Sequence, residues 1–138
     1  MSDPAQRLNA FLAATPYARF LGLRAELAGD ELTAILPYQD KLIGNVKWQS
    51  LHGGVLGAFM EMTALAQLAL IEDTPRMPKV VDVTIEYLKP GRPQITYARA
   101  DLRKVGRRIA NVHVEAWQEQ RSEPVAALRG HFLLSRGA

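Results

Sequence analysis

The longest hydrophobic stretch of the chain covers residues 55–70 and directly follows a glycine pair, Gly53-Gly54. Its apolar residues fall on every side of a helix, a pattern typical of a helix that is buried all round. We therefore predict a long central helix that ends near Ile71. Three polar residues interrupt the stretch: Glu61, Thr63 and Gln67. Although the stretch is long enough to span a membrane, these polar groups favour a protein core.

The segments on both sides of this helix alternate apolar and polar residues with a period of two, which predicts β-strands. In chain order we first expect a short helix from Asp3-Pro4 to about residue 14, ended by Thr15-Pro16, and two strands over residues 20–28 and 31–37. An irregular loop over residues 38–51 leads into the long helix. Four further strands follow, over residues 81–87, 94–105, 107–118 and 124–134. The first two strands turn at Gly29-Asp30, and the last four can pair as a meander. One face of the strand after the long helix is apolar: Val81, Val83, Ile85 and Tyr87.

The order of these elements sets the fold class. Helices and strands do not alternate as βα units, so a parallel sheet is not expected. We predict an α+β fold in which one antiparallel sheet packs on the central helix. No linker, repeat or low-complexity segment interrupts the sequence, so residues 1–138 fit a single domain.

The composition narrows the class of protein. Apolar residues make up 48% of the chain and charged residues 22%, as in soluble globular proteins. Because cysteine is absent, disulfides, thiol nucleophiles and cysteine-based zinc sites are excluded, and a reducing compartment is suitable. The first residues lack the basic-then-apolar order of a signal peptide, so we expect a cytoplasmic protein. The net charge of +3 is compatible with an anionic partner.

Glu61 is the one carboxylate within the long apolar helix, where an ionised group is costly unless it is paired. The glycine pair at the helix start is a second functional element, because free N–H groups and the positive end of the helix dipole suit a developing oxyanion. Together they indicate a site where a carbonyl is polarised at one end and attacked at the other. Partial desolvation should raise the pKa of Glu61 and improve it as a base. The alternative for Glu61 is a structural ion pair with an arginine, and for the glycines tight packing of the helix start.

Distances along the helix constrain such a site. At about 100° per residue, mostly small residues lie within about 60° of Glu61: Gly54, Gly57, Ala58, Ala64, Leu65 and Leu68. Gly53 precedes Glu61 by eight positions, or about 12 Å along the axis, whereas both groups must come within about 3 Å of one carbonyl. One helix can hardly satisfy both demands, but two antiparallel copies related by a two-fold axis can. If the pair is catalytic, the enzyme is a dimer with its sites at the interface.

With these motifs in place, the chain resembles a known family, the hotdog-fold acyl-CoA thioesterases, and in particular their phenylacetyl-CoA thioesterase-like branch. The resemblance rests on His52-Gly53-Gly54, on the carboxylate nine positions after the histidine, and on the strand motif of residues 81–90. It extends to Gly106-Arg107-Arg108 and to residues 125–132, and it covers roughly residues 20–135.

The resemblance implies an antiparallel sheet wrapped around one long helix, and a homodimer, or a dimer of dimers, in which two sheets join edge to edge. It also implies that the amide of Gly53 polarises the thioester carbonyl, with Gly54 beside it in substrate binding, while Glu61 of the other subunit attacks or activates water. The implied role of His52 is orientation; alternatively it only closes the turn before the helix. No cofactor is implied, because coenzyme A is part of the substrate.

Two positions depart from the family pattern. The family often has an asparagine six positions before the histidine, but Val46 stands there and Asn45 lies one place earlier. A loop insertion could restore the role of that side chain, so Asn45 is a candidate substrate-binding residue. Some members carry serine or threonine before the Val-Asp of the strand after the helix, to hold the attacking water, where this chain has Val80. If Val80 takes that place, another group must position the water.

Four cations surround one turn late in the chain: Arg103, Lys104, Arg107 and Arg108. A solvated hairpin end is the default interpretation of such a run. The more specific one is a contact for the phosphates of coenzyme A, since arginine matches phosphate oxygens; the candidates are Lys104, Arg107 and Arg108. Nucleic-acid binding is disfavoured because no aromatic residues are interleaved with the cations.

We therefore predict an acyl-CoA thioesterase that releases a carboxylic acid and free coenzyme A, with no nucleic acid and no membrane as partner. A hydratase or dehydratase on the same fold is one alternative, although no obvious matching histidine lies beside Glu61. A non-catalytic acyl-CoA-binding protein is the other, although the chain has no residues left for an output domain. We expect no metal, because His113 and His131 lack a neighbouring ligand set.

Overall fold

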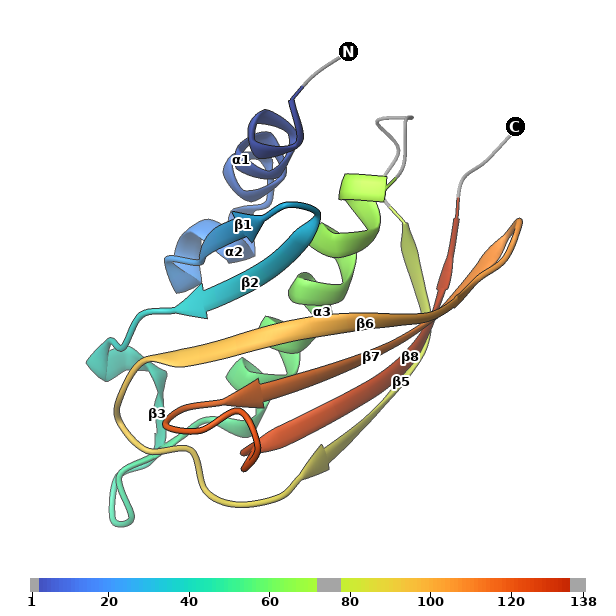
Figure 1. Ribbon diagram of the computed structural model, residues 1–138. Coiled ribbons are helices and arrows are strands. Elements are labelled where there is room, and N and C mark those ends of the chain that lie inside the picture. Colours follow the sequence, from blue (N-terminus) through green and yellow to red (C-terminus); the bar gives the residue numbers. More distant parts are fainter. Residues whose placement is uncertain (1–2, 72–77, 135–138) are drawn as a thin grey trace.

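The computed structural model describes residues 3–71 and 78–134, in which one sheet wraps around a long helix (Figure 1). The helices are α1 (Pro4–Ala14), α2 (Pro16–Leu21), the short 3₁₀ helix η1 (Asp40–Leu42) and α3 (Gly53–Ile71). The strands are β1 (Arg24–Ala28), β2 (Glu31–Leu36), β3 (Ile43–Asn45), β4 (Ser50–Leu51), β5 (Lys79–Tyr87), β6 (Thr96–Val105), β7 (Ile109–Trp117) and β8 (Ala126–Leu133). The long helix covers the residues that the apolar pattern predicts.

Six strands form one antiparallel sheet in the order β1-β2-β6-β7-β8-β5, and β3 pairs with β4 in a separate ribbon. The predicted α+β class, with an antiparallel sheet packed on a central helix, is therefore confirmed. The expected meander of the last four strands is wrong for β5. This strand pairs with β8 at the sheet edge and not with β6.

The link between β5 and β6 explains this placement. The N–H groups of Leu88 and Lys89 both donate to the carbonyl of Val125, just before β8. Further along, the side chain of Gln118, beyond the end of β7, bonds both the N–H and the carbonyl of Arg92. The link thus crosses the ends of β8 and β7, and the chain reaches the far side of β7, where β6 lies between β7 and β2.

The segments before α3 correct the prediction in two places. Pro16 ends α1, as expected, but it also begins α2, because proline fits the first position of a helix. Gly22, with a left-handed φ of 69°, caps α2, so the first strand begins at Arg24 and not at residue 20. The segment over residues 38–51 is less irregular than expected, since it contains η1, β3 and β4.

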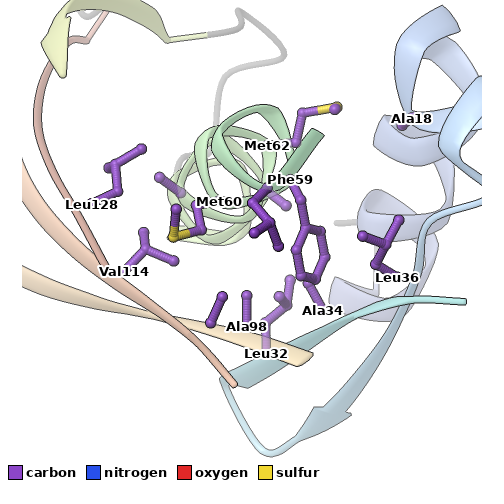
Figure 2. Close-up of a cluster of buried hydrophobic side chains, with 14 of the residues drawn as sticks. Ala18, Leu32, Ala34, Leu36, Phe59, Met60, Met62, Ala98, Val114 and Leu128 are labelled. Atoms are coloured by element: carbon purple, nitrogen blue, oxygen red, sulfur yellow. The ribbon is translucent and has the colours of Figure 1, made fainter. Parts of the chain in front are cut away.

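The core lies between α3 and the sheet (Figure 2). Phe59 and Met60 of α3 are fully buried, among side chains from α2 and four strands: Ala18, Leu32, Ala34, Leu36, Ala98, Val114 and Leu128. Within the described residues α3 is the one helix that is long and apolar enough to cross a membrane, and 67% of that window is buried in the protein. It is the core helix, as its interior polar residues predict.

One side of α3 is left open, next to β5. Apart from the final residue Ile71, the exposed and partly exposed residues of α3 fall on this side: Gly53, Gly54, Ala58, Glu61, Leu65 and Ala69. The second edge of β5 pairs with no strand of the described chain. The register of β5 with β8 shifts between Val80 and Asp82, so Val81 is an extra, bulged residue. Val83, Ile85 and Tyr87 consequently share one face of β5, as predicted. Val81 does not belong to this face and is 55% exposed.

Candidate active site

His52 accepts hydrogen bonds from three N–H groups of the first turn of α3, two of which, those of Gly54 and Val55, have no partner within the helix ladder. Its Nδ1 accepts a hydrogen bond from the N–H of Gly54 at 2.9 Å. Its carbonyl oxygen accepts from the N–H groups of Val55 and Leu56, at 3.0 and 3.2 Å. Across residues 3–71 and 78–134, the remaining N–H of this turn, that of Gly53, donates to no acceptor. The helix start therefore presents one free amide, at the positive end of the helix dipole.

The surroundings of this turn leave little room for a side chain. A Cβ on Gly54 would lie 3.1 Å from Nδ1 of His52, and a Cβ on Gly53 would lie 3.3 Å from the ring of Tyr87. Since Nδ1 of His52 accepts a hydrogen bond, the proton of a neutral imidazole resides on Nε2. The histidine also closes the turn before α3, because its N–H donates to the carbonyl of Leu42 at 2.8 Å. These bonds agree with the interpretation of His52 as a residue that closes the turn before the helix; its role in orientation stays a prediction.

Glu61 is the carboxylate on the open side of α3. It is partly buried, and this burial raises its pKa above that of an ordinary glutamate because the charged form is desolvated. Among the residues that the structure describes, no donor or cation pairs with it, so the alternative of an ion pair with an arginine has no support there. Glu61 has the properties of a base whose lone pairs are available.

Asn45, a further candidate residue, is the last residue of β3. The Oδ1 atom of Asn45 accepts a hydrogen bond from the N–H of Trp48 at 3.1 Å, so this side chain fixes the turn between β3 and β4. This turn includes Gln49, which has a left-handed φ of 52°. Asn45 is exposed, and the ribbon that carries it leads into His52.

The basic turn lies at the opposite end of the sheet from the start of α3. Ile109, just after the turn, pairs with Leu133 of β8, which also pairs with Lys79 at the start of β5. Tyr87, beside the start of α3, pairs with Ala126 at the other end of β8. The turn between β6 and β7 accordingly projects away from the start of α3 (Figure 1). Arg103 pairs with Asp101 at 2.8 Å, whereas three cations make no ion pair with the described residues: Lys104, Arg107 and Arg108. One subunit therefore does not bring these three cations to Gly53.

The sequence analysis assigned no site role to Tyr87. Its hydroxyl donates a hydrogen bond to the carbonyl of Gly53 at 2.8 Å. Alternation placed Tyr87 on the apolar face of its strand, and no motif indicated that it ends beside the first turn of α3. Tyr87 and Gly53 are 34 positions apart, so their contact depends on how the strands are arranged in the sheet, which a motif in one segment does not predict.

Comparison with known proteins identifies the family. Residues 49–125 match the family model described as "Thioesterase superfamily". This chain belongs to the thioesterase superfamily. The matched span is more than half of the chain and contains the helix start, Glu61 and the basic turn. The resemblance to thioesterases drawn from the motifs is thereby confirmed at the level of the superfamily.

Individual relatives agree with this assignment. The medium/long-chain acyl-CoA thioesterase YigI of Escherichia coli K12 is 26% identical over 125 residues, 80% of each chain. A crystal structure from Chromobacterium violaceum is 35% identical, covers 100% of both chains and has a TM-score of 0.77. The E. coli PaaI protein from the phenylacetic acid degradation operon is 20% identical, with a TM-score of 0.83 over 98% of this chain and 95% of that one; this likeness shows the fold. The hotdog arrangement is confirmed.

Proposed function

We propose that this thioesterase hydrolyses acyl-CoA thioesters to a carboxylic acid and free coenzyme A. The observation that carries the proposal concerns two groups on the same open side of α3, the N–H of Gly53 and the carboxylate of Glu61, neither of which is bonded to any residue that the structure describes. An oxyanion donor and a base are the two groups that thioester hydrolysis needs. The activity of the relative YigI, named as a medium/long-chain acyl-CoA thioesterase, supports coenzyme A as the carrier.

In this reaction the thioester oxygen accepts a hydrogen bond from the N–H of Gly53, and the helix dipole stabilises the negative charge that develops on that oxygen. Glu61 takes a proton from water as the water oxygen adds to the carbonyl carbon. The carbon–sulfur bond then breaks, and the proton passes from Glu61 to the thiolate of coenzyme A. A second route, in which Glu61 attacks the carbonyl itself and water hydrolyses the resulting anhydride, uses the same two groups.

The site needs two subunits. Gly53 and Glu61 are about 12 Å apart along α3, whereas the free edge of β5 offers a surface for a second copy. Exposed apolar residues support such contact: Val80, Val81 and Tyr87 are 38%, 55% and 54% exposed. Two β5 strands paired antiparallel about a two-fold axis would continue one sheet into the other and bring Glu61 of one subunit toward Gly53 of its partner. We propose this homodimer, alone or within a dimer of dimers.

The same symmetry gives the basic turn a role. Antiparallel pairing sets the start of one β5 beside the end of the other, so the end of the sheet that carries Lys104, Arg107 and Arg108 turns toward the partner's Gly53. Arginines that make no ion pair within the described part of the chain suit the phosphates of coenzyme A. Asn45 and Gly54 are the remaining candidates for substrate contact. A cytoplasmic location fits the absence of cysteine.

A thiol-release assay tests the proposal. The purified protein is incubated with coenzyme A thioesters of short, medium and long aliphatic acids and of phenylacetic acid, and the free thiol is measured with a chromogenic disulfide. We expect turnover of at least one acyl group, with the preferred one identified by kcat/KM. Acyl-CoA binding without thiol release would contradict the proposal and favour a binding protein.

A further inference from the structure

Tyr87, the last residue of β5, holds the peptide group that joins Gly53 to Gly54. Its hydroxyl donates to the carbonyl oxygen of Gly53 at 2.8 Å. The other end of this peptide is held as well, because the N–H of Gly54 donates to Nδ1 of His52 at 2.9 Å. Two side chains from segments far apart in the sequence thus fix one peptide plane.

The preceding peptide, between His52 and Gly53, is fixed through its carbonyl. That oxygen accepts the hydrogen bonds from the N–H groups of Val55 and Leu56. Both peptide planes that flank the α-carbon of Gly53 are therefore held in place. The N–H of Gly53 lies in the plane of the His52–Gly53 peptide and makes no hydrogen bond to the described residues. Because the Gly53–Gly54 peptide is held as well, rotation about the N–Cα bond of Gly53 is restricted and the N–H keeps its direction.

Such support matters because glycine has the least restricted backbone of all residue types. A donor stabilises an oxyanion well only when it already points at the oxygen and need not reorganise during the reaction. Tyr87 is suited to provide this support, since its own backbone is fixed: it pairs with Ala126 of β8, and the next N–H, that of Leu88, donates to Val125 at 2.9 Å.

We propose that Tyr87 is a positioning residue, whose hydroxyl holds the peptide of Gly53 and Gly54 so that the N–H of Gly53 points at the thioester oxygen. This inference rests on the proposed function. The substitution Tyr87→Phe tests it, because the ring is kept and only the hydroxyl is lost. A matched control is Tyr38→Phe, which removes a tyrosine hydroxyl that is bonded to Asp40 at 2.9 Å and not to the turn of Gly53.

We expect Tyr87→Phe to lower kcat about tenfold, less than removal of a whole oxyanion donor, while KM changes less than about twofold. Tyr38→Phe should leave both unchanged. The same tenfold loss should appear in a Glu61→Gln background, because the oxyanion contact does not depend on the base. If Tyr87 only places α3 so that Glu61 can act, the loss would vanish in that background, and the proposal would be overturned. An unchanged kcat, or a rise in KM alone, would also overturn it.

A second measurement is independent of activity. Amide hydrogen exchange, followed by NMR, should be about fivefold faster at Gly54 in Tyr87→Phe than in the unsubstituted protein, with core amides such as that of Val114 unchanged. Unaltered exchange at Gly54 would overturn the positioning role. If the unsubstituted protein released no thiol from any acyl-CoA, the proposed function would fail, whereas the exchange at Gly54 would still decide whether Tyr87 holds this peptide.

Discussion

Glu61 lies eight residues beyond Gly53 on the open side of α3, so a rise of about 1.5 Å per residue sets the carboxylate about 12 Å from the free amide along the axis. The amide sits at the positive end of the helix dipole, whereas the carboxylate lies in the middle of the helix, where partial burial desolvates it. The two groups therefore have different electrostatic surroundings within one element. This separation allows each to be tested alone.

Removal of the base should abolish most of the activity. Glu61→Gln keeps the size and hydrogen-bonding capacity of the side chain but cannot accept a proton, so we expect kcat to fall about a hundredfold or more. Steady-state thiol release measures this. Glu119→Gln is the matched control, because Glu119 is an exposed glutamate just after the end of β7. Hydrolysis at the rate of the unsubstituted enzyme by a folded Glu61→Gln protein would exclude Glu61 as the base.

The same substitution should stabilise the fold at neutral pH. Burial raises the pKa of Glu61 in the folded protein, so the folded state binds more protons than the unfolded state between the ordinary and the raised value, and stability falls as pH rises through that window. Glu61→Gln removes this penalty. Its thermal midpoint should exceed that of the unsubstituted protein by up to a few degrees at about pH 7, and the difference should disappear near pH 4. A lower midpoint at neutral pH would mean that Glu61 makes a stabilising contact.

The sequence predicted those features that depend on local pattern. The apolar stretch identified α3, because a helix buried all round has few polar residues. Glu61 was identified because it is the one charged residue within that stretch. Gly29-Asp30 was found because the turn needs a residue with positive φ. The motif of His52 and the two glycines indicated where α3 begins, and a helix start always leaves N–H groups without helical partners. The position of the Gly53 amide could therefore be predicted from the sequence.

Features that depend on tertiary contacts were missed. Pro16 was interpreted as a helix end, although proline is equally suited to a helix start. The bulge at Val81 left no signal, because a single extra residue does not disturb the composition of the strand. The position of β5 beside β8, and hence the bond from Tyr87 to Gly53, follows from a link that crosses the sheet ends, which periodicity along one strand cannot report.

Removal of two arginines from the basic turn should weaken the binding of acyl-CoA more than it slows the chemical step. Replacement of both Arg107 and Arg108 by alanine should raise KM for acyl-CoA more than it lowers kcat, because phosphate contacts are felt equally in the ground and transition states. The same acyl group carried on pantetheine, which lacks the nucleotide phosphates, should be hydrolysed equally by both proteins. An equal effect on the two substrates would make the turn a structural element only.

A charge on the free edge of β5 should separate the subunits. Val81 is bulged and 55% exposed, so Val81→Asp should leave the fold of a subunit intact while burial of its carboxylate opposes an interface. We expect a shift from dimer to monomer in sedimentation velocity and a parallel loss of activity. Ile95→Asp, at a residue 40% exposed outside the strands, serves as the control. An active monomer carrying Val81→Asp would contradict a site at this edge.

The separation of Gly53 and Glu61 predicts that two inactive variants restore each other. One carries Glu61→Ala; the other carries Gly53→Val, whose Cβ would lie 3.3 Å from the ring of Tyr87 and displace the amide. After subunit exchange, a mixed dimer has one site with both defects and one site with neither, because the intact Gly53 and the intact Glu61 come from different subunits. Random exchange of equal amounts makes about half of the dimers mixed, each with one working site of two, so roughly a quarter of the activity should return. If mass spectrometry confirms exchange and no activity returns, the two residues do not act on one thioester across the interface.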